Sequence, residues 1–202
     1  FTGRIIIGEP NAPKYLNTPQ TPLYDKSRHV FGLSQAKESI RKSDYAVIVE
    51  GNLDVVSSHQ VGITQVVATA GTAMTEAHLK ALVRLSPNAR LAFDGDAAGL
   101  AATERAIPIA QKVGIDLTII RLPEGSKDPD ELIQEDPALW QKAIDESSGV
   151  IEWLLEQYTK REDMTSPMGK RHFTTAALAV VRALTDPVEQ EHYMQKIAAY
   201  TN

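Results

Sequence analysis

The chain has 202 residues and a net charge of −5, with 43% hydrophobic and 23% charged residues, as expected of a globular protein with one large or two small domains. It contains no cysteine, which excludes a disulfide framework, a cysteine-based zinc site and a thiol nucleophile. No apolar run approaches the length of a membrane span, so we expect no membrane partner.

Charge is unevenly distributed along the chain. Residues 1–44 hold seven Lys/Arg against four Asp/Glu, whereas the remainder holds fourteen against twenty-two. A basic N-terminal part and an acidic remainder are compatible with phosphate binding by the first and metal binding by the second. Ordinary surface charge explains the same pattern. The chain begins with Phe1 rather than methionine, from which we expect a piece of a longer protein.

The first 30 residues are rich in turn-forming residues and predict extended loop around one strand at 4–7. A regular alternation of expected helices and strands follows. The expected helices cover residues 33–41 and 54–60, a segment capped by Thr75, and residues 97–112, where Pro108 should kink or shorten the helix. The expected strands cover residues 45–49, 65–69, 90–93 and 116–122. This order predicts an α/β protein with a mostly parallel sheet flanked by helices.

Beyond residue 122 the pattern is helical. Four helix starts place a capping residue directly before a proline, namely Asp128-Pro129, Asp136-Pro137, Ser166-Pro167 and Asp186-Pro187. Apolar stripes at helical spacing then predict a helical bundle over about residues 137–200. We therefore divide the chain into a short N-terminal basic arm (1–44), an α/β domain (45–136) and a C-terminal helical subdomain (137–202).

Acidic residues follow three of the expected strands. Glu50 follows the first, Asp94 and Asp96 follow the third, and Asp128 follows the fourth. Because the carboxyl ends of parallel strands meet at one edge of a sheet, we expect these acids to converge there. Oxygen ligands at this spacing suit Mg²⁺ or Mn²⁺. The alternatives are a hairpin turn at Asp94-Gly95 and, for Asp128, a plain helix cap.

The turn-rich front carries cations and aromatic residues in alternation. The cations Arg4, Lys14, Lys26 and Arg28 are interspersed with Tyr15, Tyr24 and Phe31, which could order them on one surface. Lys14 and Lys26 also suit an ordinary exposed surface. The five histidines are scattered without zinc-ligand spacing, and we assign them no role.

Three segments in order resemble the Toprim fold: EGNLDV at 50–55, TAGTA at 69–73 and DGDAAG at 94–99. That fold is shared by bacterial primases, topoisomerases of types IA and II, and some nucleases. PKYLNTP at 13–19, KDPDEL at 127–132 and DPVEQEHY at 186–193 are similar to bacterial DNA primases of the DnaG type. The resemblance covers essentially the whole chain, with departures at Asn52, usually aromatic in the family, and Leu100, often basic there.

The resemblance implies RNA primer synthesis for DNA replication, by metal-dependent nucleotidyl transfer from ribonucleoside triphosphates on a single-stranded DNA template. It implies a catalytic, metal-binding role for Glu50, Asp94 and Asp96, and further metal-site acids at Asp54, Asp128 and Asp130. The residues that it implies for substrate and template binding are Arg4, Lys14, Asn17 and Lys26.

Further expectations come from the same resemblance. The cofactor is Mg²⁺ or Mn²⁺, with zinc only in a missing N-terminal module. The arm at 1–44 is the remnant of a basic subdomain, and the replicative helicase is contacted through a missing C-terminal region. The protein is expected in the bacterial cytoplasm, and this piece alone is expected to have weak or no activity.

Three other functions use similar residues. A Toprim nuclease would use the same acids but lack the PKYLN arm. A phosphatase with a nucleophilic aspartate also has a strand ending in Asp-x-Asp, but usually carries Thr or Val where this chain has Ala98. A non-enzymatic fragment would bind nucleotides or DNA without turnover.

Overall fold

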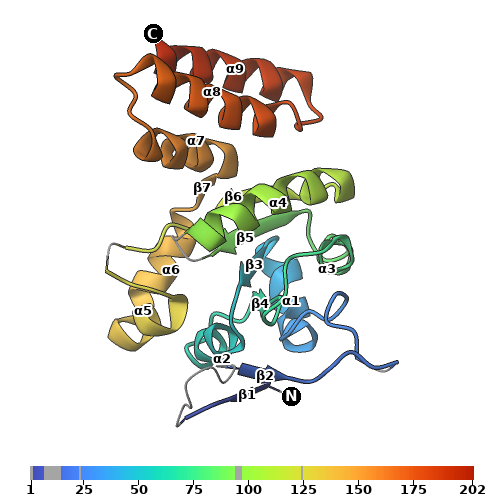
Figure 1. Ribbon diagram of the computed structural model, residues 1–202. Coiled ribbons are helices and arrows are strands. Elements are labelled where there is room, and N and C mark those ends of the chain that lie inside the picture. Colours follow the sequence, from blue (N-terminus) through green and yellow to red (C-terminus); the bar gives the residue numbers. More distant parts are fainter. Residues whose placement is uncertain (1, 7–14, 23, 94–96, 124) are drawn as a thin grey trace.

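The computed structural model describes residues 2–6, 15–22, 24–93, 97–123 and 125–202 (Figure 1). Its centre is a five-stranded sheet of order β4-β3-β5-β6-β7. The strands are β3 (Ala46–Val49), β4 (Val66–Ala68), β5 (Asn88–Ala92), β6 (Asp116–Ile119) and β7 (Ser148–Gly149). All neighbours pair in parallel except β6 and β7, which are antiparallel. The predicted α/β class with a mostly parallel sheet is confirmed.

Helices cover both faces of this sheet because its strands are apolar on both sides. Ile48 and Leu91 pack in one core with α1 (Leu33–Ser43), α3 (Glu76–Leu82) and α4 (Ala97–Val113). Their neighbours Val47 and Ala92 pack in a second core with α2 (Asn52–Gln60), α5 (Pro129–Glu135) and α6 (Pro137–Asp145). Successive strand residues point to opposite faces, so the unbroken apolar run of β3 requires cover on both.

The C-terminal helices are α7 (Val150–Arg161), α8 (Pro167–Val181) and α9 (Pro187–Thr201). They stack beyond α4, at the opposite end of the molecule from the N-terminal strands (Figure 1). The predicted cap residues Asp128, Asp136, Ser166 and Asp186 each accept a hydrogen bond from the backbone at the start of their helix. These four helix starts are therefore confirmed.

Helix α6 packs with the sheet rather than with the C-terminal helices. Trp140 and Ile144 of α6 are fully buried in the second core, beside Val49 and Val55. The Trp140 indole N–H also donates to the Ser58 hydroxyl of α2 at 3.1 Å. The boundary that we drew at residue 136 stays a prediction, and the packing of α6 favours placing it later, near β7.

Several elements differ from the expectation. The expected strand at 4–7 lies earlier, as β1 (Thr2–Arg4), and it pairs antiparallel with an unexpected β2 (Tyr15–Asn17). Strand β5 begins at Asn88 because it pairs with β6 from that residue onward. Pro108 does not shorten α4, which continues to Val113. These differences follow from pairing and packing between distant segments, which override local pattern.

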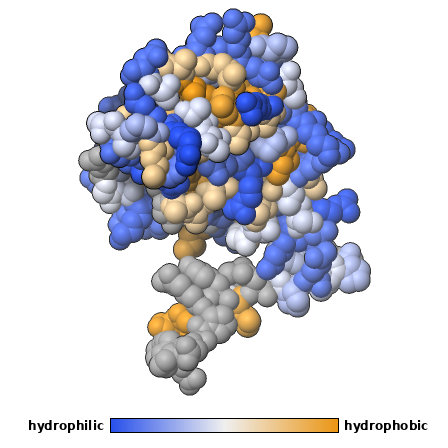
Figure 2. Space-filling view, turned by 45° about the horizontal axis from the view of Figure 1, so that its top comes forward, coloured by the Kyte–Doolittle hydropathy of each residue, from blue (hydrophilic) through white to orange (hydrophobic). Residues whose placement is uncertain are grey.

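The surface is mostly polar. Figure 2 shows hydrophilic side chains over most of the face it presents, with smaller hydrophobic areas between them. Exposed large hydrophobic residues on the C-terminal helices include Met168, Val188, Met194 and Tyr200. Among the helices that the structure describes, none has the length and apolar character needed to cross a lipid bilayer.

Candidate active site

The candidate site begins where β3 and β5 end side by side. Val49, the last residue of β3, is in register with Ala92, the last residue of β5, and both strands run in the same direction. Glu50 follows β3 and is exposed. Asp94 and Asp96 lie outside the described residues, between Phe93 and Ala97. Their convergence with Glu50 stays a prediction, which the parallel register of the two preceding strands supports.

Asp54 connects two helix starts at this edge. It lies in the first turn of α2 and is only 7% exposed. One carboxylate oxygen accepts from the Gly51 backbone N–H at 3.0 Å, and the other accepts from the Asp130 backbone N–H at 3.3 Å. The second bond joins residues 76 positions apart and fixes the first turn of α5 against the first turn of α2.

Asp128 and Asp130 complete this group of carboxylates. Asp128 caps α5 by accepting from the Glu131 backbone N–H at 2.8 Å. Asp130 accepts from the Ser57 hydroxyl of α2 and, at 2.9 Å, from the Gln134 side-chain amide. We call Asp54, Asp128 and Asp130 the acidic cluster. The structure thus brings together three of the six predicted metal-site acids, although Asp128 and Asp54 also serve their helices locally.

The acids of the cluster act on one another electrostatically. Burial, together with the negative charges of Asp128 and Asp130, raises the pKa of Asp54 to about 6. The backbone N–H groups of Gly51 and Asp130 partly oppose this shift because they stabilise the carboxylate. The two backbone hydrogen bonds therefore stabilise the charged form of Asp54 by less than its burial and its acidic neighbours destabilise it.

The chemistry of the cluster fits a divalent cation. No Lys or Arg of the described chain forms an ion pair with any of its three carboxylates. Carboxylate oxygens are the ligands that Mg²⁺ and Mn²⁺ prefer. Within the same described segments, however, no three acidic or histidine side chains lie close enough together to hold an ion. A complete site thus requires residues beyond the cluster, for which Glu50, Asp94 and Asp96 are the candidates.

The structure describes three of the four predicted substrate-binding residues. Arg4 lies in β1 and Asn17 in β2, two strands whose register pairs Arg4 with Tyr15 and Thr2 with Asn17. Lys14 lies outside the described residues. Lys26 is half-buried, and its backbone carbonyl lies 2.8 Å from the His78 ring nitrogen Nε2. The roles of all four residues stay predictions.

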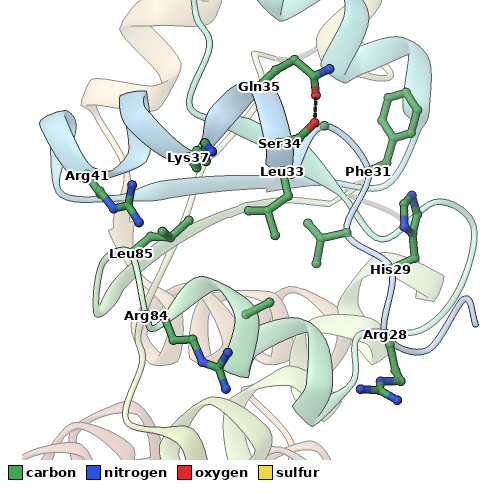
Figure 3. A pocket seen from close by; sticks show the side chains of 13 residues that line it. Arg28, His29, Phe31, Leu33, Ser34, Gln35, Lys37, Arg41, Arg84 and Leu85 are labelled. Atoms are coloured by element: carbon green, nitrogen blue, oxygen red, sulfur yellow. Dashed lines mark hydrogen bonds between the residues drawn. The ribbon is translucent and has the colours of Figure 1, made fainter.

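A separate hollow lies between α1, α3 and the segment that precedes α1 (Figure 3). It has a volume of about 700 Å³, and its apolar lining residues include Val30, Leu33 and Leu85. Its other lining residues include the cations Arg28, Lys37, Arg41 and Arg84, and none of the described residues that line it is acidic. Three of these cations lie on α1 or just after α3, and none of the three was predicted as a functional residue from the sequence. The four-residue spacing of Lys37 and Arg41 on one helix is the signal that would have indicated a shared face.

The fold and the acidic edge of the sheet together define a class of protein. A parallel sheet whose carboxyl edge carries Glu50 and the acidic cluster is the arrangement expected of a Toprim domain, and a family model described as Toprim-like matches residues 47–133. Two further models match the flanking parts. The N-terminal domain of the DNA primase catalytic core matches residues 1–37, and the DnaB-helicase binding domain of primase matches residues 151–202.

Individual relatives extend this likeness to nearly the whole chain. The DNA primase of Synechocystis sp. is 36% identical over 192 residues, which are 91% of this chain and 30% of that protein. The RNA polymerase domain of Mycobacterium tuberculosis primase DnaG matches with a TM-score of 0.83 and 30% identity, over 98% of this chain and 65% of that one. A DnaG primase catalytic domain bound to ssDNA matches with a TM-score of 0.79 and 28% identity, over 99% and 63% of the two chains.

The chain belongs to the bacterial DNA primase family, and it corresponds to the part of the catalytic core that contains the Toprim domain. It spans about a third of the length of the curated relatives that it matches. The helicase contact that we expected through a missing C-terminal region stays a prediction, and the model described as the DnaB-helicase binding domain of primase matches residues 151–202 of this chain.

Proposed function

We propose that this chain forms the Toprim and helical part of a primase that joins ribonucleotides into an RNA primer on a single-stranded DNA template. The observation that carries the proposal is the acidic cluster, which lies on the helices that follow β3 and β6, at the edge where Glu50 also emerges. Such an edge, combined with a basic front, suits the transfer of a nucleotidyl group, because phosphates need cations and the reaction needs metal-binding acids.

The roles of the residues follow from their chemistry. Glu50, Asp94 and Asp96 would hold Mg²⁺ or Mn²⁺, with the acidic cluster beside them. Bound metal ions neutralise the charge that develops on the attacking and leaving oxygens of an in-line displacement. Arg4, Lys14, Asn17 and Lys26 would hold the triphosphate and the template, so that the primer hydroxyl and the α-phosphate are held in line. Asp54 fixes α5 against α2 and thereby keeps Asp128 and Asp130 at the edge.

The partners of the proposed enzyme are single-stranded DNA, ribonucleoside triphosphates and the RNA primer. One matching catalytic domain is described as bound to ssDNA, and the helicase-binding family model supports helicase contact through α7, α8 and α9. Zinc is expected only in a separate N-terminal module. Because replication is cytoplasmic in bacteria, the proposal also implies a location in the bacterial cytoplasm.

The test is primer synthesis by the full-length protein on single-stranded DNA with ribonucleoside triphosphates and Mg²⁺. We expect short RNA products that depend on template and metal. A Toprim nuclease would instead shorten the DNA in the same reaction, and template cleavage without RNA products would favour that alternative. Binding of template without either product would leave the fragment as a binding module.

The raised pKa of Asp54 predicts a pH-dependent stability. Because the pKa in the folded chain is about 6 rather than 3.8, folding favours the protonated acid. The stabilisation is complete below pH 3.8 and is lost as the pH rises through about 6. We expect the free energy of unfolding to fall by roughly 2 kcal/mol over this range from this group.

Urea unfolding of the metal-free chain at several pH values measures this loss. Asp54→Asn should reduce the dependence, whereas Asp145→Asn, at an exposed position on α6, should not change it. Added Mg²⁺ should move the loss to lower pH, since a nearby cation stabilises the carboxylate. An identical profile in Asp54→Asn would show that Asp54 does not titrate in this range.

The cation-lined hollow predicts additional contacts with nucleic acid. We propose that Lys37 and Arg84 bind phosphates of a single strand, because each is exposed and forms no ion pair in the described chain. Replacing either with alanine should weaken DNA affinity and reduce the slope of log K against log salt by about 0.7. Fluorescence anisotropy at several salt concentrations measures both quantities. Lys142→Ala, whose lysine already faces Glu146, is the control, and unchanged slopes for Lys37 and Arg84 would contradict the proposal.

A further inference from the structure

The turn that carries Lys26 has its own hydrogen-bond network. One carboxylate oxygen of Asp25 accepts from the Ser27 backbone N–H at 2.9 Å and from the Ser27 hydroxyl at 2.6 Å. The Asp25 carbonyl accepts from the backbone N–H groups of Arg28 and His29 at 3.1 and 3.0 Å. These bonds define a compact turn that contains Lys26, but they do not fix its place relative to the sheet.

Helix α3 holds this turn from a distant part of the chain. The His78 ring nitrogen Nε2 lies 2.8 Å from the Lys26 carbonyl oxygen, across 52 positions of sequence. The Thr75 hydroxyl donates to the Ser27 carbonyl at 2.5 Å. The carbonyls of three successive residues, Asp25, Lys26 and Ser27, are therefore all engaged, two of them by α3 and its cap. The backbone beneath the Lys26 side chain is fixed against the sheet domain.

The protonation state of His78 follows from its partners. The Thr75 backbone N–H donates to His78 Nδ1 at 3.3 Å, so Nδ1 must carry a lone pair. The proton therefore lies on Nε2, which donates it to the Lys26 carbonyl. Burial lowers the pKa of His78, and the side chain is only 1% exposed, so the neutral ring with both nitrogens bonded is the stable form. Each ring nitrogen thus has a distinct task.

We propose that His78, with Thr75, is a positioning residue for nucleotide binding, which fixes the Lys26 turn so that the lysine side chain meets a substrate phosphate. This inference rests on the proposed role of Lys26 as a phosphate-binding residue. Its physical basis is preorganisation: a cation on a turn that is already ordered loses less conformational entropy when the phosphate binds. A free turn would have to be ordered at the expense of nucleotide affinity.

Two variants separate the tasks of the ring nitrogens. Asn at position 78 reproduces the Nδ1 acceptor for Thr75 but is too short to reach the Lys26 carbonyl, whereas Gln places an N–H near the position of Nε2. In the full-length protein we expect His78→Asn to raise the KM for ribonucleoside triphosphates about tenfold, from an unsatisfied, half-buried carbonyl of Lys26 and a looser turn. Its kcat should change little. His78→Gln should restore most of the affinity.

A double-mutant cycle with Lys26 distinguishes positioning from stability. Lys26→Ala alone should raise KM, and His78→Asn should add almost nothing in that background, because both changes remove the same phosphate contact. Thermal unfolding of each variant measures the structural cost separately. If His78→Asn does not fold, the KM of Thr75→Val is compared with that of Thr75→Ser. Only serine keeps the hydroxyl that bonds the Ser27 carbonyl and caps α3.

The outcomes discriminate between the two proposals. A raised KM in Lys26→Ala with an unchanged KM in His78→Asn would overturn the positioning role alone. An unchanged KM in Lys26→Ala would remove the phosphate-binding role of Lys26 and the positioning role with it. A lower melting temperature with unchanged KM in His78→Asn would assign His78 to fold stability only. Additive effects of the two substitutions on KM would also contradict the proposal.

Discussion

Asp94→Ala is expected to abolish Mn²⁺ binding and to reduce primer synthesis by at least about a thousandfold, since a metal ion contributes several kcal/mol to the stabilisation of developing charge. In the sequence, Asp94 comes two residues after the end of β5, the strand adjacent to β3, and two residues before Asp96. Removing one carboxylate from an oxygen-only site leaves too few charged ligands to compete with water for a strongly hydrated ion. Calorimetry or paramagnetic relaxation measures the binding, and primer synthesis measures the activity.

The matched control is Asp145→Ala, which removes an equivalent charge from an exposed position on α6. It should leave Mn²⁺ affinity and synthesis unchanged. Mn²⁺ binding of wild-type strength in Asp94→Ala would place the metal site elsewhere. Lost synthesis with intact binding would instead give Asp94 a role other than metal ligation.

Trp140→Ala is expected to lower the free energy of unfolding by about 3–5 kcal/mol, the usual cost of removing a large buried aromatic side chain. Trp140 is fully buried between α6 and the sheet. Its indole N–H donates to Ser58, whose hydroxyl donates in turn to the Asp54 carbonyl at 2.6 Å. The substitution therefore leaves a cavity and also loosens the helix that carries Asp54.

Urea unfolding followed by far-UV circular dichroism checks this expectation without relying on tryptophan emission. Trp140→Phe keeps most of the volume and loses the indole hydrogen bond, so it should cost less, about 1–2 kcal/mol. Equal losses in the two variants would show that the hydrogen bond, rather than the cavity, dominates. A loss below about 1 kcal/mol in Trp140→Ala would mean that the site collapses around the smaller residue.

The parallel sheet could be predicted because its strands carry strong local patterns. The four apolar residues of β3 must be buried on both faces, and the proline-started helices carry their caps in the sequence itself. The strands that were missed have no such pattern. β7 consists of Ser148 and Gly149 alone and exists only because β6 lies beside it, and β2 has only three residues, which pair with β1.

The candidate site was predictable as a group of acids but not as a geometry. Strand-end position and the motif resemblance indicated Asp54, Asp128 and Asp130 before any contact was known. The bond from the Asp130 backbone to the Asp54 carboxylate depends on how α5 folds back over α2, which no local pattern specifies. His78 was assigned no role because the five histidines are scattered along the sequence without zinc-ligand spacing. Its partner, the Lys26 carbonyl, comes from a loop that only the tertiary fold places nearby.

The long sequence separation within the acidic cluster has a consequence for the nascent chain. The ribosome completes Asp54 before it reaches Asp130, 76 positions later, and at bacterial rates of synthesis this interval lasts about 4–15 seconds. During that time β3 and α2 exist without α5, and Asp54 has neither the Asp130 backbone donor nor the repelling neighbours that it has in the finished domain. The acidic edge is therefore assembled late during synthesis of the chain. The proposed metal site thus lacks part of its set of acids until most of the sheet has been translated.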